Sequence, residues 1–96
     1  MELTSRQRAA LRSQANGLEP VIFVGHSGVT DSVVHQAEEV LTARELVKGT
    51  VLENAPVTAR EACDELAERT GAAGVQVIGR KFVLFRENPE DRKVFY

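Results

Sequence analysis

The sequence of 96 residues contains one cysteine, Cys63, and no tryptophan. A single cysteine excludes an internal disulfide framework and any zinc cluster built from cysteines. The chain also has no apolar run approaching the ~18 residues of a membrane-spanning helix, and its start, MELTSRQRAAL, lacks the apolar stretch of a secretion signal. The absences and the length predict one cytoplasmic domain. We expect this domain to need no metal, no other cofactor, no membrane and no small-molecule substrate.

Positive charge is in short supply, with 12 Lys and Arg residues against 14 Asp and Glu, a net charge of −2. Taken alone, this balance argues against a nucleic-acid binder, because phosphate contacts require Lys and Arg. The distribution is uneven, however. Residues 1–16 carry three arginines and one acid, residues 79–96 five basic and three acidic side chains, and residues 31–69 nine acids and four bases. The folded chain could present a basic face opposite an acidic one, or the charges could simply solvate the surface.

Capping residues and apolar periodicity predict three helices and four strands. The expected elements are a helix from Thr4 to about Asn16, a strand at 21–24, a helix capped by Thr30, a strand at Glu45–Glu53, a helix opened by Pro56 and ended by Gly71, and strands at 74–78 and 82–86.

Strands separated by helices favour parallel crossovers, whereas the last two strands, joined by Gly79-Arg80, favour a hairpin. The expected fold class is therefore α/β: a compact α-β-α-β-α-β-β domain with a mixed four-stranded sheet. We expect this domain to occupy residues 1–86, followed by a flexible tail at 87–96.

The stretch VIFVGHSGVT at 21–30 places two glycines between a predicted strand and a predicted helix. It nearly matches the Gly-x-Ser-x-Gly elbow of hydrolases, but Val29 stands at the fifth position and the later His35 precedes any plausible acid partner. The phosphate-loop motif Gly-x-x-x-x-Gly-Lys-Ser/Thr and the dinucleotide-binding motif Gly-x-Gly-x-x-Gly are both absent from the sequence. A Gly-x-x-Gly loop that lets a nucleic-acid backbone come close remains, as in KH domains, although two glycines in a turn are more often only a turn.

Four blocks in order, LTSRQRAALRSQA, LEPVIFVGHSGVT, ELVKGTVLE and ELAERTGAAGVQVIGRKFVLFR, resemble the CRM domain family (chloroplast RNA splicing and ribosome maturation) in its stand-alone bacterial YhbY form. The resemblance spans Leu3 to Arg86. It implies a fold similar to the C-terminal domain of a bacterial translation initiation factor. It also implies an RNA-binding protein that is not an enzyme, acts in ribosome biogenesis and associates with rRNA of large-subunit precursors.

The resemblance and the basic residues near it give a set of candidate RNA-binding positions. The family's Gly-x-x-Gly loop matches Gly25, His26, Ser27 and Gly28. The candidate cations are Arg6, Arg8 and Arg12 on the first helix, Lys48 on the second strand, and Arg80, Lys81 and Arg86 at the last hairpin, where Gly79 matches the family's turn.

Two further expectations concern recognition. With only four Phe and one Tyr, few aromatics are available to stack on bases, so recognition of phosphate and shape is favoured over sequence reading. Phe23 is expected in the core, together with at least one of Phe82 and Phe85. The alternative function is a protein-interaction module whose acidic stretch 31–69 docks basic ribosomal proteins.

Overall fold

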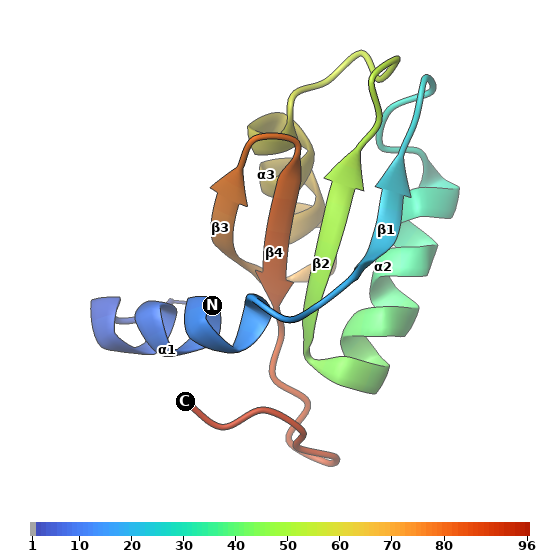
Figure 1. Cartoon of the computed structure of the whole chain (residues 1–96). Coiled ribbons are helices and arrows are strands. Elements are labelled where there is room, and N and C mark those ends of the chain that lie inside the picture. The colour runs from blue at the N-terminus through green and yellow to red at the C-terminus, as the bar shows by residue number, and fades with distance from the viewer. Residues whose placement is uncertain (1) are drawn as a thin grey trace.

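The computed structural model describes residues 2–96, and its seven elements follow the predicted order. They are α1 (Ser5–Ala15), β1 (Pro20–Val24), α2 (Asp31–Arg44), β2 (Leu46–Val51), α3 (Ala59–Thr70), β3 (Ala73–Ile78) and β4 (Lys81–Phe85). Figure 1 shows the four strands as one sheet with helices on its two sides. The predicted α/β class with three helices and a four-stranded sheet is confirmed.

A threonine caps the N-terminus of each of these three helices. The side chains of Thr4, Thr30 and Thr58 each accept a hydrogen bond from the backbone N–H three residues later. The predicted capping box of Thr4 with Gln7 is present. The third helix begins at Ala59 rather than at Pro56, because Thr58 and Glu61 form a second capping box that the sequence reading overlooked.

The sheet has the strand order β1-β2-β4-β3. The pair β1/β2 is parallel, as expected for two strands joined by a helix, and both pairs made by β4 are antiparallel. The hairpin turn consists of Gly79 and Arg80, with Gly79 at φ 58° in the first central position. The predicted mixed sheet and hairpin are confirmed.

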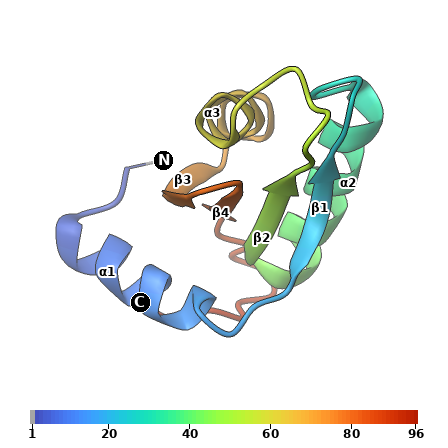
Figure 2. The same ribbon diagram turned by 45° about the horizontal axis from the view of Figure 1, so that its top comes forward.

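Two separate cores lie on the two faces of the sheet. Helices α2 and α3 cover one face, while α1 crosses the other face at one end of the strands (Figure 2). The larger core includes Ile22, Val24, Leu41, Val47, Cys63, Leu66, Phe82 and Leu84. The smaller one consists of Leu11, Ala15, Leu46, Val75, Val83, Phe85 and Val94.

The aromatic residues divide between these faces. Phe82 and Phe85 are both buried, one in each core, because residues three apart on a strand point to opposite sides. The prediction that at least one is core is confirmed. The prediction for Phe23 is wrong, since half of this residue is exposed (50%). Its neighbours Ile22 and Val24 fill the larger core, so Phe23 points to the opposite side, which α1 and the C-terminal residues cover only in part.

Residues 87–96, which the sequence predicts to be a flexible tail, fold back against the domain. The buried carboxylate of Glu45 accepts hydrogen bonds from the backbone N–H of Asn88 (2.6 Å), Lys93 (2.6 Å) and Val94 (2.8 Å). The ring of Tyr96 packs edge-on against Phe85, with 5.0 Å between ring centroids. The tail thus completes the smaller core below α1.

Candidate nucleic-acid interface

The Gly-x-x-Gly segment forms a tight turn at the carboxyl end of β1. The N–H of Gly28 donates to the carbonyl oxygen of Gly25 (2.9 Å), and His26 and Ser27 between them are exposed. Across residues 2–96, no acceptor is found for the backbone N–H of either His26 or Ser27. The turn therefore presents two adjacent amide donors to solvent, directly before the N-terminus of α2.

The two glycines have different structural roles. Gly28 has φ +72°, a conformation that side chains with a Cβ rarely adopt, so the turn requires glycine there. At Gly25 an added Cβ would only make an ordinary contact of 3.8 Å with Leu52 Cδ1. Backbone geometry accounts for Gly28, while nothing within the domain requires a glycine at position 25.

Three segments meet at this end of the sheet: the turn 25–28, the loop 52–58 and the hairpin turn at Gly79-Arg80 (Figure 1). Backbone bonds hold them together, from Leu52 N–H to the Val24 oxygen and from Val51 N–H to the Arg80 oxygen, both 2.8 Å. The guanidinium of Arg80 is exposed and lies 3.7 Å from the Glu53 carboxylate. Among the arginines predicted to bind RNA, Arg80 therefore lies at the same end of the sheet as the turn.

The arginines of α1 lie at the other end of the sheet (Figure 1). Arg6 is exposed and Arg12 is half-buried. Arg8 donates from Nη1 to the carbonyl oxygen of Gly74, near the start of β3. Arg8 thus anchors α1 to the sheet. The structure does not bring the α1 arginines and the turn into one compact cluster.

Arg86 is engaged within the domain. Its Nη1 donates to Glu38 Oε2 (2.7 Å) and to the carbonyl oxygen of Thr70 (2.8 Å), and its Nη2 donates to Thr42 Oγ1 (2.9 Å). A cation at the carboxyl ends of two helices is favoured by their dipoles. Arg86 therefore ties α2, α3 and β4 together.

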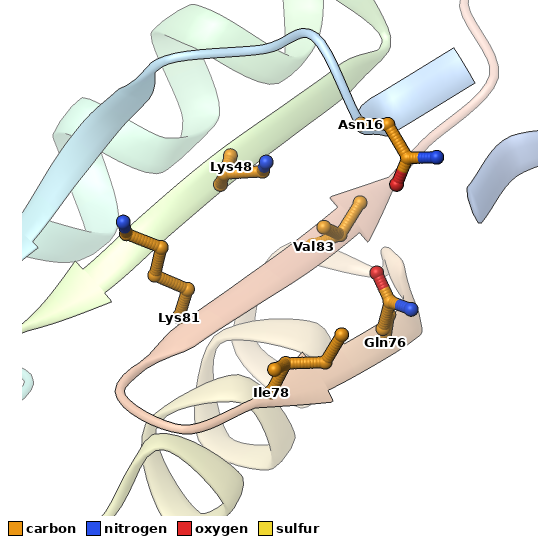
Figure 3. Close-up of a pocket in the computed structure, with 6 residues that line it drawn as sticks. All are labelled: Asn16, Lys48, Gln76, Ile78, Lys81 and Val83. Atoms are coloured by element: carbon orange, nitrogen blue, oxygen red, sulfur yellow. The ribbon is translucent and has the colours of Figure 1, made fainter. Parts of the chain in front are cut away.

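Lys48 and Lys81 come together on neighbouring strands, β2 and β4, on the sheet face that α1 leaves partly uncovered (Figure 3). They line a hollow of about 160 Å³ together with Asn16, Gln76, Ile78 and Val83. Neither lysine forms an ion pair with any residue of the described range 2–96. Two unpaired ammonium groups beside a shallow depression suit an extended anion better than an enclosed small molecule, whose pockets measure about 300–1,000 Å³.

The sequence reading missed the apolar members of this face. Phe23 (50% exposed) and Ile78 (65% exposed) flank the two lysines, one on each outer strand of the sheet. A signal was available in the alternation of β1, in which Ile22 and Val24 share one side and Phe23 takes the other. Only the placement of α1 shows that this other side is open.

The one cysteine of the chain, Cys63, is a free and buried thiol. Burial raises the pKa of the Cys63 thiol to about 11, and the neighbouring Asp64 carboxylate adds to this shift, so the thiolate is scarce at neutral pH. Within residues 2–96, no group of three His, Cys, Asp or Glu side chains is placed to hold a metal ion. None of the helices in that range is both long and apolar enough to cross a bilayer.

Comparison with known proteins defines the class. The CRS1/YhbY (CRM) domain family profile matches residues 3–86, almost the whole chain. The chain belongs to the CRS1/YhbY (CRM) domain family.

Relatives of known name and structure agree with this class. The chain is 37% identical over 92 residues to "Probable RNA-binding protein YqeI" of Bacillus subtilis, covering 96% of each chain. It is 33% identical over 88 residues to a Haemophilus influenzae protein named "RNA-binding protein", covering 92% of this chain and 89% of that one. The solution structure of a hypothetical Staphylococcus aureus protein, described as a candidate RNA binder, superposes with a TM-score of 0.80 at 35% identity over 95% of both chains.

Proposed function

We propose that this protein binds rRNA in precursors of the large ribosomal subunit and serves as a non-catalytic assembly factor in the cytoplasm. Family membership and the names of the relatives support RNA as the ligand. The observation that carries the proposal is the exposed turn at 25–28, whose His26 and Ser27 N–H groups have no acceptor among the described residues.

In the proposed complex, a phosphate of the RNA backbone sits on the turn. The amides of His26 and Ser27 donate to its oxygens, and the N-terminus of α2 adds a favourable dipole. Asp31 opposes the phosphate at this helix end, but its carboxylate is paired with Arg69 at 2.7 Å. That ion pair reduces the repulsion that a free Asp31 would exert.

The candidate cations take different parts in this proposal. Arg80 and Lys81 contact phosphates at the end of the sheet that carries the turn, and Lys48 contacts a phosphate farther along the sheet. Arg6 and Arg12 extend the footprint at the far end. Arg8 and Arg86, whose guanidinium groups bond to backbone oxygens of the domain, act by holding α1 and the helix layer in place.

The test of the turn is a pair of substitutions at the exposed Ser27. Ser27→Asp places a carboxylate where the phosphate is expected, so we expect the Kd for a large-subunit rRNA fragment to rise on the order of tenfold or more, about 1.4 kcal/mol. Ser27→Asn has a similar size and no charge and should bind nearly as the wild type does. Fluorescence anisotropy with a labelled rRNA fragment measures both. Equal affinities for the two variants would contradict phosphate binding at the turn.

Binding should also depend on salt, with a log–log slope of roughly −0.9 for each duplex phosphate neutralised. A flat salt response would contradict the proposed phosphate contacts as a whole. Sedimentation of particles from cells then tests the ribosomal assignment, since the protein should travel with large-subunit precursors.

The alternative is docking to ribosomal proteins through the acidic stretch, because exposed acids such as Glu39 and Glu68 lie on α2 and α3. Ribonuclease treatment of precursor particles separates the two functions. Release of the protein favours RNA as its attachment, and retention favours a protein partner.

A further inference from the structure

A row of side chains crosses all four strands on the sheet face that α1 leaves open. Phe23 on β1 is the partner of Thr50 on β2, Thr50 is the partner of Lys81 on β4, and Lys81 is the partner of Ile78 on β3. With strands about 4.8 Å apart, this row is roughly 14 Å long. We call the surface made by this row and the adjacent Lys48 the open sheet face.

The alternation of the strands fixes the direction of these side chains. Val47, Val51 and Phe82 point into the core beneath α2 and α3, so Thr50 and Lys81, one residue away, point to the opposite side. Phe23 does the same, being flanked by two residues of that core. The row is thus a continuous surface on one side of the sheet.

Helix α1 and the tail cover the opposite end of this side, where Leu46, Val83 and Phe85 are buried. The covered region ends at the hollow of about 160 Å³ formed by Lys48, Lys81 and four further residues, among them Asn16 from the end of α1 (Figure 3). Ile78, at the edge of this hollow, is 65% exposed, and Phe23 on β1 is 50% exposed. The domain thus leaves half or more of the Phe23 and Ile78 side chains uncovered.

The charge of the open sheet face points to a polyanion. Two of the chain's three lysines, Lys48 and Lys81, are on it and unpaired among the described residues, whereas the third, Lys93 in the tail, is paired with Asp91 at 2.7 Å. The acids nearest in the chain are Glu45, Glu53 and Glu19. The Glu45 carboxylate is buried and bonded to the tail, Glu53 lies 3.7 Å from Arg80, and Glu19 precedes β1. Proteins bind single-stranded nucleic acid through cations that hold the phosphates and exposed aromatic rings that stack on the bases.

We propose that the open sheet face binds an unpaired segment of the RNA, with one base stacked on the Phe23 ring and the backbone phosphates held by Lys48 and Lys81. The inference rests on the proposed RNA-binding function and deepens it by naming single-stranded RNA as the part recognised there. A base in a duplex cannot reach the ring, because its faces are covered by its neighbours.

The face continues directly into the phosphate-binding turn. Phe23 is two residues before Gly25, so a strand that leaves the turn passes over the ring within one or two nucleotides. Four-stranded sheets that stack two or three bases on aromatic side chains are a general solution for binding single-stranded RNA. This face would stack one base, because Phe23 is the aromatic residue in its row.

The first experiment compares two phenylalanines that are both exposed. Phe23→Leu keeps an apolar side chain on the strand but removes the ring. We expect it to raise the Kd for a single-stranded rRNA oligonucleotide about 5- to 150-fold, the range for loss of one stacked base. Phe95→Leu, a change at the 73% exposed ring in the tail, should leave the Kd unchanged. Circular dichroism melts confirm that both variants are folded.

The second experiment uses the absence of tryptophan from the sequence. Phe23→Trp introduces a single indole, whose fluorescence a stacked base should quench when the oligonucleotide binds. Phe95→Trp is the matched control and should show little quenching. In salt titrations with the same oligonucleotide, Lys48→Gln and Lys81→Gln should each reduce the magnitude of the slope by roughly 0.7, and Lys93→Gln should not.

The outcomes separate this inference from the function on which it rests. Suppose that the protein binds the oligonucleotide and the rRNA fragment and that Ser27→Asp weakens this binding. If Phe23→Leu and Phe23→Trp then behave like Phe95→Leu and Phe95→Trp, the open sheet face is not the site, although the protein still binds RNA. Equal affinity for the oligonucleotide and its duplex would also overturn the inference. Dimerisation or binding of a ribosomal protein that Phe23→Leu abolishes, with RNA affinity unchanged, would assign the face to a protein. If the wild type binds no RNA, the proposed function fails together with this inference.

Discussion

At the scale of single residues, the contact between Gly49 and Phe82 shows how a position that looks weak in the sequence is required by packing. The two residues are partners across β2 and β4, and a Cβ added at Gly49 would lie less than 3.0 Å from three carbons of the Phe82 ring. Glycine inside a strand is unfavourable by itself. Here it makes room for a ring that is almost fully buried in the larger core.

We therefore expect Gly49→Ala to lower the free energy of unfolding by about 1–3 kcal/mol, because the ring must shift within a filled core. Urea denaturation gives this value directly. Gly17→Ala is the control, since an added Cβ there meets nothing within 4 Å and the residue has no positive φ. A loss of stability of the same size in both variants would show that the Phe82 ring is not the cause, because the backbone entropy of a Gly→Ala change by itself favours the folded state.

At the scale of elements, the connection from α2 to β2 also holds the tail. Glu45 is the one non-glycine residue of the described chain with a positive φ (65°), and its side chain is buried. Burial raises the pKa of this carboxyl, but three backbone N–H donors and the Arg92 guanidinium at 3.1 Å outweigh it, so that its pKa lies below the usual value of 4.5. The Arg92 guanidinium also lies 3.0 Å from Glu87 and stacks over the rings of Phe95 and Tyr96.

Because the folded-state pKa is lowered, ionised Glu45 stabilises the docked tail fully at pH above 4.5, and this contribution is lost as the pH falls through the folded-state value. We expect the amides of Lys93 and Val94 to lose hydrogen-exchange protection over that acidic range, after correction for the intrinsic rate. Exchange measured by NMR or mass spectrometry tests this.

The matched variants are Glu45→Gln, which should expose the same amides at neutral pH, and Glu90→Gln at an exposed acid of the tail, which should not. Protection that is unaffected by Glu45→Gln would mean that the tail is held by the Tyr96 and Val94 packing alone.

At the scale of the whole molecule, charge is divided between the two sides of the sheet. The lysines on the open sheet face are unpaired within residues 2–96. Exposed acids such as Glu39 and Glu68 belong to α2 and α3, which lie on the other side of the sheet (Figure 2). Exposed charges separated by more than about 8 Å are largely screened at physiological salt. A net charge of −2 is therefore compatible with a surface that attracts RNA locally.

We expect the double substitution Glu39→Gln/Glu68→Gln on the helical side to change the Kd for RNA less than about twofold at 0.15 M salt, for this reason. Lys48→Gln, which removes one charge on the other side, should weaken binding clearly. The same helical variant also tests the alternative function. Loss of the protein from precursor particles, with RNA affinity intact, would show that the acidic surface docks a protein.

Local interactions explain how much of the fold could be predicted. Thr4 and Thr30 cap helices through bonds to residues only three positions away, and the Gly79-Arg80 turn is also a local feature, so sequence spacing was sufficient. The predicted start of the third helix at Pro56 is wrong because proline also favours the first turn of a helix. The capping box of Thr58 and Glu61, which sets the observed start, is an equally local signal. Glu45 was assigned to a strand because no local pattern indicates its positive φ.

The site could be predicted only in part. The position of the turn at Gly25–Gly28 followed from its place between a strand and a helix. Whether a given cation is free depends on distant partners: Arg8 meets Gly74 across 66 positions, and Arg86 meets Glu38 across 48. Sequence spacing could not separate these two arginines from Lys48 and Lys81.

The sequence by itself therefore determined the order of elements, the mixed sheet, the place of the glycine turn and the family, because these depend on caps, periodicity and motifs that are local or linear. Only the tertiary structure decided that Phe23 is exposed, that Arg86 is held inside the domain and that residues 87–96 are docked. The physical reason is that exposure and charge pairing depend on which face α1 covers and on contacts between segments far apart in the chain, and no local pattern records either.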